Sequence, residues 1–301
     1  MFLQQLINGL SLGAIFALIA LGYTMVYGVL GFINFAHGDV FMLGAFVGFY
    51  VTPLVARFVH LPGMAGFIIV MLAAMVVCAL LGVIIEYLAY RPLRGKPKLA
   101  MLITAIGVSL FLEYAGQWLF GPDPKPFPDL IEDHPIIDLD HGNILVQASQ
   151  ALVLALTVAL LIALHFIVRK TKIGTAMRAL SYNQQAAALM GINTGRVISF
   201  TFALGSALAG AGGILYALTY PSIDPLMGIM PGLKAFIAAV LGGIGNLPGA
   251  ALGGFLLGLT DTFVGASRFS TYRDGIAFAV LILILLFRPT GILGRVEVEK
   301  V

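Results

Sequence analysis

The feature that most constrains this chain is a repeated series of long apolar stretches that almost exclude charge. Each is about 20 residues long, the length that a helix needs to cross a bilayer. Hydrophobic residues make up 60% of the 301 positions and charged residues only 10%, and the mean hydropathy is +1.01. A soluble domain carries about 25% charged residues. The sequence therefore predicts an all-α polytopic membrane protein.

Nine apolar segments are candidates for membrane crossings. They lie at about 5–30, 38–57, 63–90, 99–120, 147–168, 197–219, 229–244, 248–266 and 272–288. The seventh is short and rich in glycine, so it either crosses or re-enters the membrane. We expect eight or nine crossings, and arginines near the C-terminus favour nine. The whole chain, 1–301, is expected to form one transmembrane domain.

The charges of the loops predict the orientation. "RPLRGKPK" (91–98) and "RKTKIGTAMR" (169–178) each hold four basic residues and no acid, and such loops are typically cytoplasmic. The loop between them, at about 121–146, holds six acids and five prolines and is the predicted outer loop. Counting crossings back from residue 91 places the N-terminus outside. The C-terminus is inside if the seventh segment crosses fully.

Several functional classes lack their sequence signals. Cys78 is the only cysteine, so an intrachain disulfide is impossible. The chain has no G-x-x-x-x-G-K-[ST] phosphate loop. Its histidines form no zinc-binding pattern, and a net charge of +3 gives no indication of a nucleic-acid partner. We expect no catalytic residues, metal or cofactor in this chain.

The stretch "GVLGFINFAHGDVFMLGAF" (28–46) places three strongly polar residues, Asn34, His37 and Asp39, within an apolar region. One interpretation is a plain turn wetted by the cytoplasm. The other is an interrupted helix, with a break permitted by Gly38 and Asp39 capping the helix that follows. Unwound backbone at membrane depth is tolerated only where it lines a cavity or is buried in protein.

Two further carboxylates lie inside apolar segments. Ionisable groups in the membrane are energetically expensive, so each is a functional candidate. Glu113 lies toward the outer half of its segment and Asp261 about halfway or further along its own; a structural role is the alternative for both. The candidate pathway and gate residues are Asn34, His37, Gly38, Asp39, Glu113 and Asp261.

The largest cytoplasmic loop carries a polar segment at about 174–195 that is too polar to span the membrane. The residues from 176 to 190 favour one helix, and Gly191 is placed to end it. Met177, Leu180, Ala187 and Met190 recur at helical spacing and predict one mildly apolar face. We expect a short amphipathic helix on the cytoplasmic side, resting either on its own bundle or on a partner.

Within this segment, "QQAAALMG" (184–191) resembles the Glu-Ala-Ala-x-x-x-Gly core of ABC importer permeases, with Gln185 in place of Glu. In that family the segment is a coupling helix that docks on the ATP-binding subunit. The sugar-type motif continues with Ile-x-Leu-Pro, which is missing here. The resemblance implies these coupling residues: Arg178, Ala179, Asn183, Gln185, Ala186, Ala187, Gly191 and Ile192.

A wider resemblance covers almost the whole chain. Residues 7–46, "RALSYNQQAAALMGIN" (178–193) and "AFIAAVLGGIGNLPGAALGGFLLGL" (235–259) resemble the smaller permease of bacterial branched-chain amino acid ABC importers. This implies a vitamin B12- or ribose-permease-like fold in the bacterial inner membrane. It also implies a second, homologous permease, two ATP-binding subunits that carry ATP and Mg²⁺, and a periplasmic or lipoprotein solute-binding protein.

A second functional class stays open on the residues alone. The chain could be a self-contained secondary transporter or channel for a small neutral or zwitterionic solute, with Asp39, Glu113 or Asp261 as an ion or proton site. That hypothesis predicts activity from this chain alone and gives no reason for the Ala-rich cytoplasmic helix.

Small residues recur four apart, as in Gly249/Gly253 and Gly254/Gly258. In lipid, this spacing lets helix backbones approach closely. We expect tight packing inside one chain, with a subunit interface as the alternative.

Overall fold

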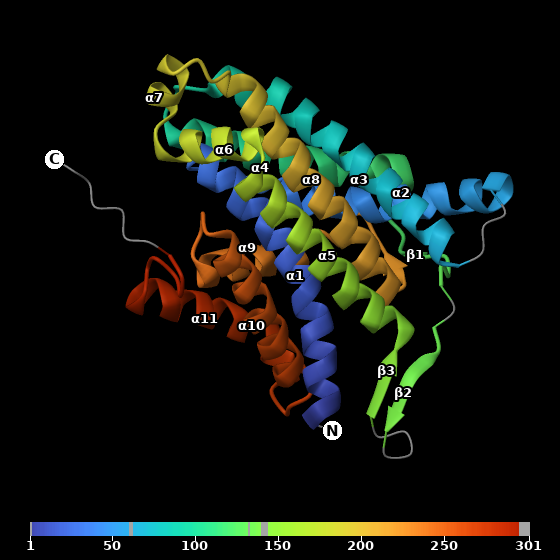
Figure 1. The fold of residues 1–301 in the computed structure, drawn as a ribbon. Coiled ribbons are helices and arrows are strands. Elements are labelled where there is room, and N and C mark those ends of the chain that lie inside the picture. Colours follow the sequence, from blue (N-terminus) through green and yellow to red (C-terminus); the bar gives the residue numbers. More distant parts are fainter. Residues whose placement is uncertain (1, 60–62, 132, 140–143, 295–301) are drawn as a thin grey trace.

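The computed structural model describes residues 2–59, 63–131, 133–139 and 144–294. Within that part, eight helices are long and apolar enough to cross a membrane, which matches the predicted all-α membrane fold (Figure 1). The helices are α1 (Phe2–Leu30), α2 (His37–Val59), α3 (Met64–Ile85), α4 (Lys98–Phe120), α5 (Ala148–Lys170), α6 (Lys172–Tyr182), α7 (Gln184–Leu189), α8 (Thr194–Thr219), α9 (Ile229–Gly242), α10 (Leu247–Gly265) and α11 (Arg273–Phe287). Shorter helical turns are η1 (Glu86–Tyr90), η2 (Arg91–Leu93) and η3 (Ser270–Tyr272).

The described residues also include four short strands, which hydropathy did not predict. The strands are β1 (Lys125–Pro126), β2 (Pro135–Leu139), β3 (Ile144–Gln147) and β4 (Ser222–Ile223). β2 and β3 form an antiparallel pair within the predicted outer loop. β1 pairs with β4, which follows the C-terminal end of α8. Residues 132 and 140–143 of that loop lie outside the described residues.

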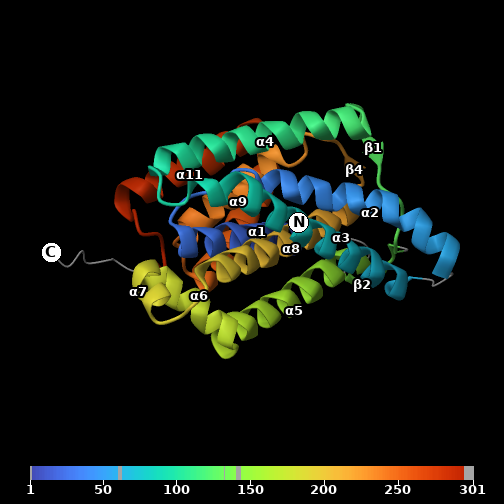
Figure 2. The same ribbon diagram turned by 90° about the horizontal axis from the view of Figure 1, so that it is seen from above.

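Helix α1 lies at the centre of the bundle, with α4 and α5 at opposite edges (Figure 2). In the most apolar part of α1, 94% of the residues are buried inside the protein. Its backbone touches that of α10, because a Cβ added at Gly258 would collide with the backbone of Gly13, and one added at Gly254 with that of Ala17. The small residues thus serve close packing within one chain, as predicted.

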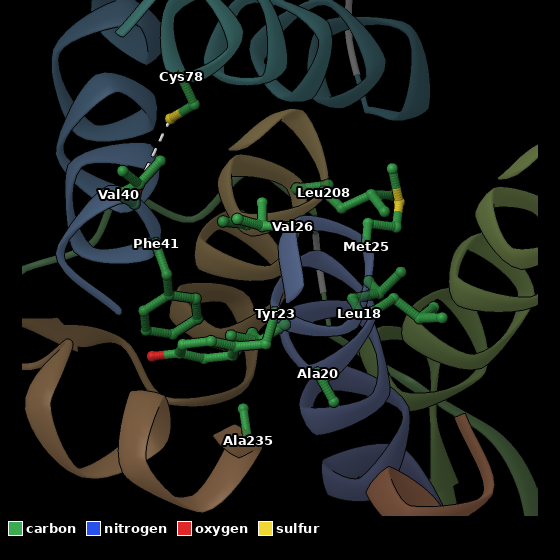
Figure 3. Packing of buried hydrophobic residues seen from close by; sticks show 14 of the residues in the cluster. Leu18, Ala20, Tyr23, Met25, Val26, Val40, Phe41, Cys78, Leu208 and Ala235 are labelled. Atoms are coloured by element: carbon green, nitrogen blue, oxygen red, sulfur yellow. Dashed lines mark hydrogen bonds between the residues drawn. The ribbon is translucent and has the colours of Figure 1, made fainter. Parts of the chain in front are cut away.

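The core continues from α1 onto α2, α8 and α9. Figure 3 shows Tyr23 of α1, Phe41 of α2 and Ala235 of α9 around one apolar centre, while the Cys78 thiol of α3 donates to the Val40 carbonyl at 3.5 Å. Cys78 is buried, so it serves as a packing residue.

The two ends of α1 identify the two sides of the bundle. Its C-terminal end contacts the loop helices, where the Gln184 side chain donates to the Val29 carbonyl at 2.8 Å. Its N-terminal end contacts the acidic loop, where the Leu145 amide donates to Gln4 at 2.8 Å. The basic and acidic loops therefore lie at opposite ends of α1, as the charge pattern predicts.

Helix α9 explains the ambiguous seventh apolar segment. Its 14 residues extend about 21 Å, which is shorter than the roughly 30 Å hydrocarbon core. The chain enters it from β4, on the acidic-loop side, and leaves it near Gly245, which lies beside Gly28 at the opposite end of α1. The chain thus passes from one side of the bundle to the other nine times. Eight of these passages, in the described part, are helices of membrane length, and the short α9 makes the ninth.

Candidate functional site

The polar stretch after α1 is a buried break between two helices. Helix α1 ends at Leu30, Gly31 takes a left-handed φ of 70°, and α2 begins at His37. A Cβ added at Gly22 would collide with the His37 ring. Since Gly22 precedes the end of α1 by eight residues, α2 begins about 12 Å inside the bundle. The wetted-turn interpretation is wrong, because the chain folds back along α1 before α2 starts.

Asn34 and His37 are held by the protein's own core. Asn34 is 3% exposed and accepts a hydrogen bond from the Tyr90 hydroxyl at 2.6 Å. His37 is 1% exposed, and its ring meets the Tyr23 ring edge-on at 4.8 Å between centroids. The ring also lies against the backbone of Ile19 on α1, which is its polar contact in the core.

Gly38 has a different role from the one predicted. It lies inside α2 rather than at the break, and a Cβ there would be 2.7 Å from the Gly228 carbonyl and 3.2 Å from Gly232. The missing side chain therefore lets the N-terminal ends of α2 and α9 touch within the bundle. The left-handed conformation that breaks the helix belongs to Gly31 instead.

Asp39 lies in the first turn of α2, where its negative charge favours the helix dipole. Its carboxylate is 2% exposed and accepts a hydrogen bond from the Ser109 hydroxyl of α4. Glu113, one turn further along α4, is only partly buried. These contacts join α2 to α4 through Asp39.

Asp261 belongs to a charge network. It is 3% exposed and pairs with Lys234 of α9 at 2.7 Å and with Arg273 of α11. Lys234 also pairs with Asp274 at 2.7 Å. The two positive and two negative charges compensate one another, as buried ions require. Sequence reasoning missed this network, although opposite charges in adjacent apolar segments are a sign of pairing.

The segment that the loop charges predict to be cytoplasmic forms two helices, so the single helix predicted over 176–190 is wrong. Asn183, with φ −160° and ψ 110°, separates α6 from α7. Its side chain accepts a hydrogen bond from the Ala186 amide at 2.9 Å and caps α7. Gly191, with φ 82°, follows the end of α7, as predicted.

The predicted coupling residues divide between an inner and an outer face of these helices. Ala187 is 5% exposed and packs against the protein itself, as Met177 and Leu180 do, whereas Met190 does not share that face. The exposed members are Arg178, Asn183, Gln185, Ala186 and Gly191, and Ala179 and Ile192 are half-buried.

Three exposed apolar side chains flank α7 and were not predicted. Tyr182 is 93% exposed, Leu189 89% and Met190 83%. Large apolar side chains gathered at one projecting helix mark a surface suited to a partner.

No metal site is formed in the part of the chain that the structure covers: no group of three His, Cys, Asp or Glu side chains there is placed to hold an ion. The polar residues of the core instead bond to the protein, with Asn34 on Tyr90 and Asp39 on Ser109.

The sequence is similar to known permeases along its whole length. The family model described as "Branched-chain amino acid transport system / permease component" matches residues 5–285. The high-affinity branched-chain amino acid transport system permease protein BraD of Pseudomonas aeruginosa is 44% identical, covering 100% of this chain and 98% of its own. LivH of Escherichia coli, of the same description, is 42% identical with the same coverage. The ribose import permease RbsC of Haemophilus influenzae is 25% identical over 93% of this chain and 83% of its own.

Proposed function

Because the chain belongs to the branched-chain amino acid transport permease family, we propose that it forms half of the translocation pathway for leucine, isoleucine and valine. It is a transmembrane subunit of an importer, with several spans in the bacterial inner membrane. The substrate class follows from the relatives, whose names state branched-chain amino acid transport.

The remaining subunits belong to the proposal. A second, homologous permease completes the pathway, two ATP-binding subunits supply ATP and Mg²⁺, and an external solute-binding protein delivers the substrate. This chain's part is to bind those subunits and to change shape with them.

The observation that carries the coupling role is the surface of α7. A six-residue helix projects from the basic side of the bundle, as Figure 1 shows. Tyr182 at the end of α6, Leu189 at the end of α7 and Met190 just after it are almost fully exposed. Burying such side chains in a cleft of an ATP-binding subunit removes apolar surface from water and stabilises the complex. The short helix can then follow a rigid-body motion of that subunit.

A direct contact links this surface to the break in the bundle. Gln184, the first residue of α7, donates to the carbonyl of Val29, two residues before Gly31. A shift of α7 would therefore pull on the end of α1 where the backbone is already interrupted. Asn34 and His37 follow this point and are buried in this structure; we assign them to the polar lining that the inner gate exposes when the break moves.

Ala186→Arg tests the docking surface. Ala186 is exposed on α7, and a long charged side chain there should keep the ATP-binding subunit from seating. We expect loss of that subunit on co-purification, with the second permease still bound. Ser270→Arg places the same charge at an exposed site on the opposite side and should leave the ATP-binding subunit bound. Retention in the Ala186 variant would contradict the coupling role.

Reconstitution tests the function as a whole. The complete complex with its solute-binding protein should accumulate leucine in proteoliposomes only when ATP is supplied. The purified chain alone should not. Uptake of leucine by the chain alone down an ion gradient would instead establish a secondary transporter.

A further inference from the structure

A polar cavity of about 390 Å³ opens on the side of the bundle opposite α7. Its walls come from the N-terminal part of α1, the start of α5, the end of α8, the end of α10 and the start of α11. This volume lies in the range of small-molecule sites. Most of its lining is uncharged and polar, including Asn8, Ser11, Gln150 and Thr262.

Two hydrogen-bonding groups of the lining have no partner among the described residues. The Ser11 hydroxyl belongs to a residue that is 2% exposed, and its oxygen is unbonded. Nε of Arg273 is also buried and unbonded. A buried donor without a partner is expensive, and both groups line the cavity, so a bound solute can satisfy both.

The charges around the cavity favour a zwitterion over a simple ion. Among the described residues, Arg273 is the only charged member of its lining, and its guanidinium already pairs with Asp261. That pairing reduces the net attraction for an anion, while the Nε–H remains available to a carboxylate oxygen. The lining also offers the side-chain oxygens of Gln5, Thr219 and Thr262 as acceptors for an ammonium group. Asn8 Oδ1 is not among these acceptors, because it already accepts from Gln150 at 2.8 Å and from Gln4 at 3.0 Å.

We propose that this cavity binds the ammonium and carboxylate head group of the carried amino acid on the outer side of the membrane. The proposal rests on the proposed function. The carboxylate accepts from Ser11 and from Nε of Arg273, and the amide and hydroxyl oxygens of the lining receive the ammonium group. Gly265, whose Cβ position lies 3.6 Å from the Arg273 guanidinium, leaves room beside that group.

Ser11→Ala separates a ligand-binding role from a structural one. If the hydroxyl were only structural, removing an unbonded buried group would leave leucine binding unchanged. We expect about tenfold weaker binding of radiolabelled leucine to the complete complex in nanodiscs without the solute-binding protein, with thermal stability unchanged or higher.

Thr262→Val provides a second variant with a matched control. Thr262 lines the cavity, while Thr260 on the same helix does not appear in its lining and bonds to the Leu256 carbonyl. We expect weaker leucine binding for Thr262→Val and unchanged binding for Thr260→Val. Leucinol, which has no carboxylate, should fail to displace leucine.

The outcomes distinguish this proposal from the proposed function. If the complete complex transports leucine but shows no leucine binding of its own, or if Ser11→Ala binds as the unmodified complex does, the cavity is no substrate site and the importer function stands. Displacement by leucinol as effective as by leucine would overturn the contact with Arg273. Absence of ATP-dependent leucine uptake would overturn the proposed function itself.

Discussion

The position of His37 depends on a single missing side chain. Its ring occupies the space that a Cβ on Gly22 would take, and it also meets the edge of Tyr23. The start of α2 can therefore reach its depth in the bundle only because residue 22 is glycine. The His37 ring therefore fits only against a glycine at position 22.

Gly22→Ala should disturb the contact between residue 22 and the His37 ring. The added methyl group collides with a fully packed ring, and such overpacking costs about 1–3 kcal/mol. We expect a lower melting temperature and weaker transport. Gly107→Ala is the control, because a Cβ there meets nothing within 4 Å, and alanine favours the helix. A melting temperature for Gly22→Ala equal to that of the control would contradict the steric fit.

The network around Asp261 yields a prediction with an internal control. The Asp261 side chain is 1% exposed and that of Asp274 is 49% exposed, and both pair with Lys234. Breaking a buried pair costs about 3–5 kcal/mol, whereas an exposed pair contributes about 0–1 kcal/mol. Asp261→Asn should therefore lower the free energy of unfolding in detergent far more than Asp274→Asn. Equal losses would show that the buried pair is not structural.

The polar residues in the break could be selected from the sequence, but their partners could not. Asn34, His37 and Asp39 stand out because their neighbours are apolar. Asn34 bonds to Tyr90 and Asp39 to Ser109, and these pairs are 56 and 70 residues apart in the chain. Periodicity within one segment carries no information on such distant contacts.

At the scale of elements, the segment after α5 shows how a cap overrides helix propensity. The run from 176 to 190 favours one helix by composition. Asn183 instead takes an extended conformation and caps a new helix with its side chain. The break turns Leu189 and Met190 outward, so the docking surface depends on a conformation that propensity does not predict.

Gln184→Leu should uncouple α7 from α1. The substitution removes the 2.8 Å hydrogen bond to the Val29 carbonyl and keeps a side chain of similar size. We expect ATP hydrolysis by the assembled complex to continue while leucine uptake per ATP falls severalfold. Ser181→Leu alters an exposed residue outside the predicted coupling set and serves as the control for added apolar surface. Equal uptake per ATP in both variants would contradict the proposed link.

For the whole molecule, hydropathy and loop charge predicted the order of the helices and the separation of the basic and acidic loops to opposite ends well, because each signal is local to one segment. The apolar segments at 99–120 and 197–219 correspond to α4 and α8. The same signals could not predict that α2 begins inside the bundle, since hydropathy measures length and composition rather than depth.

Cysteine labelling checks the nine-crossing path. Cys78 is buried, so the natural chain should react poorly with a membrane-impermeant maleimide. Tyr182→Cys should react only in inside-out vesicles and Ser270→Cys only in right-side-out vesicles, since these exposed residues lie on opposite sides. Labelling of both from the same side would contradict the path through α9.

The central place of α1 has a consequence for how the chain is made. α1 is synthesised first, yet the glycines that it presents to α10 are covered only when residues 247–265 have been made. Until then, its small-residue face has only lipid or the insertion machinery beside it. The core of this protein is therefore completed only after α10 has been made, and a chain that stops before α10 lacks the partner that α1 requires.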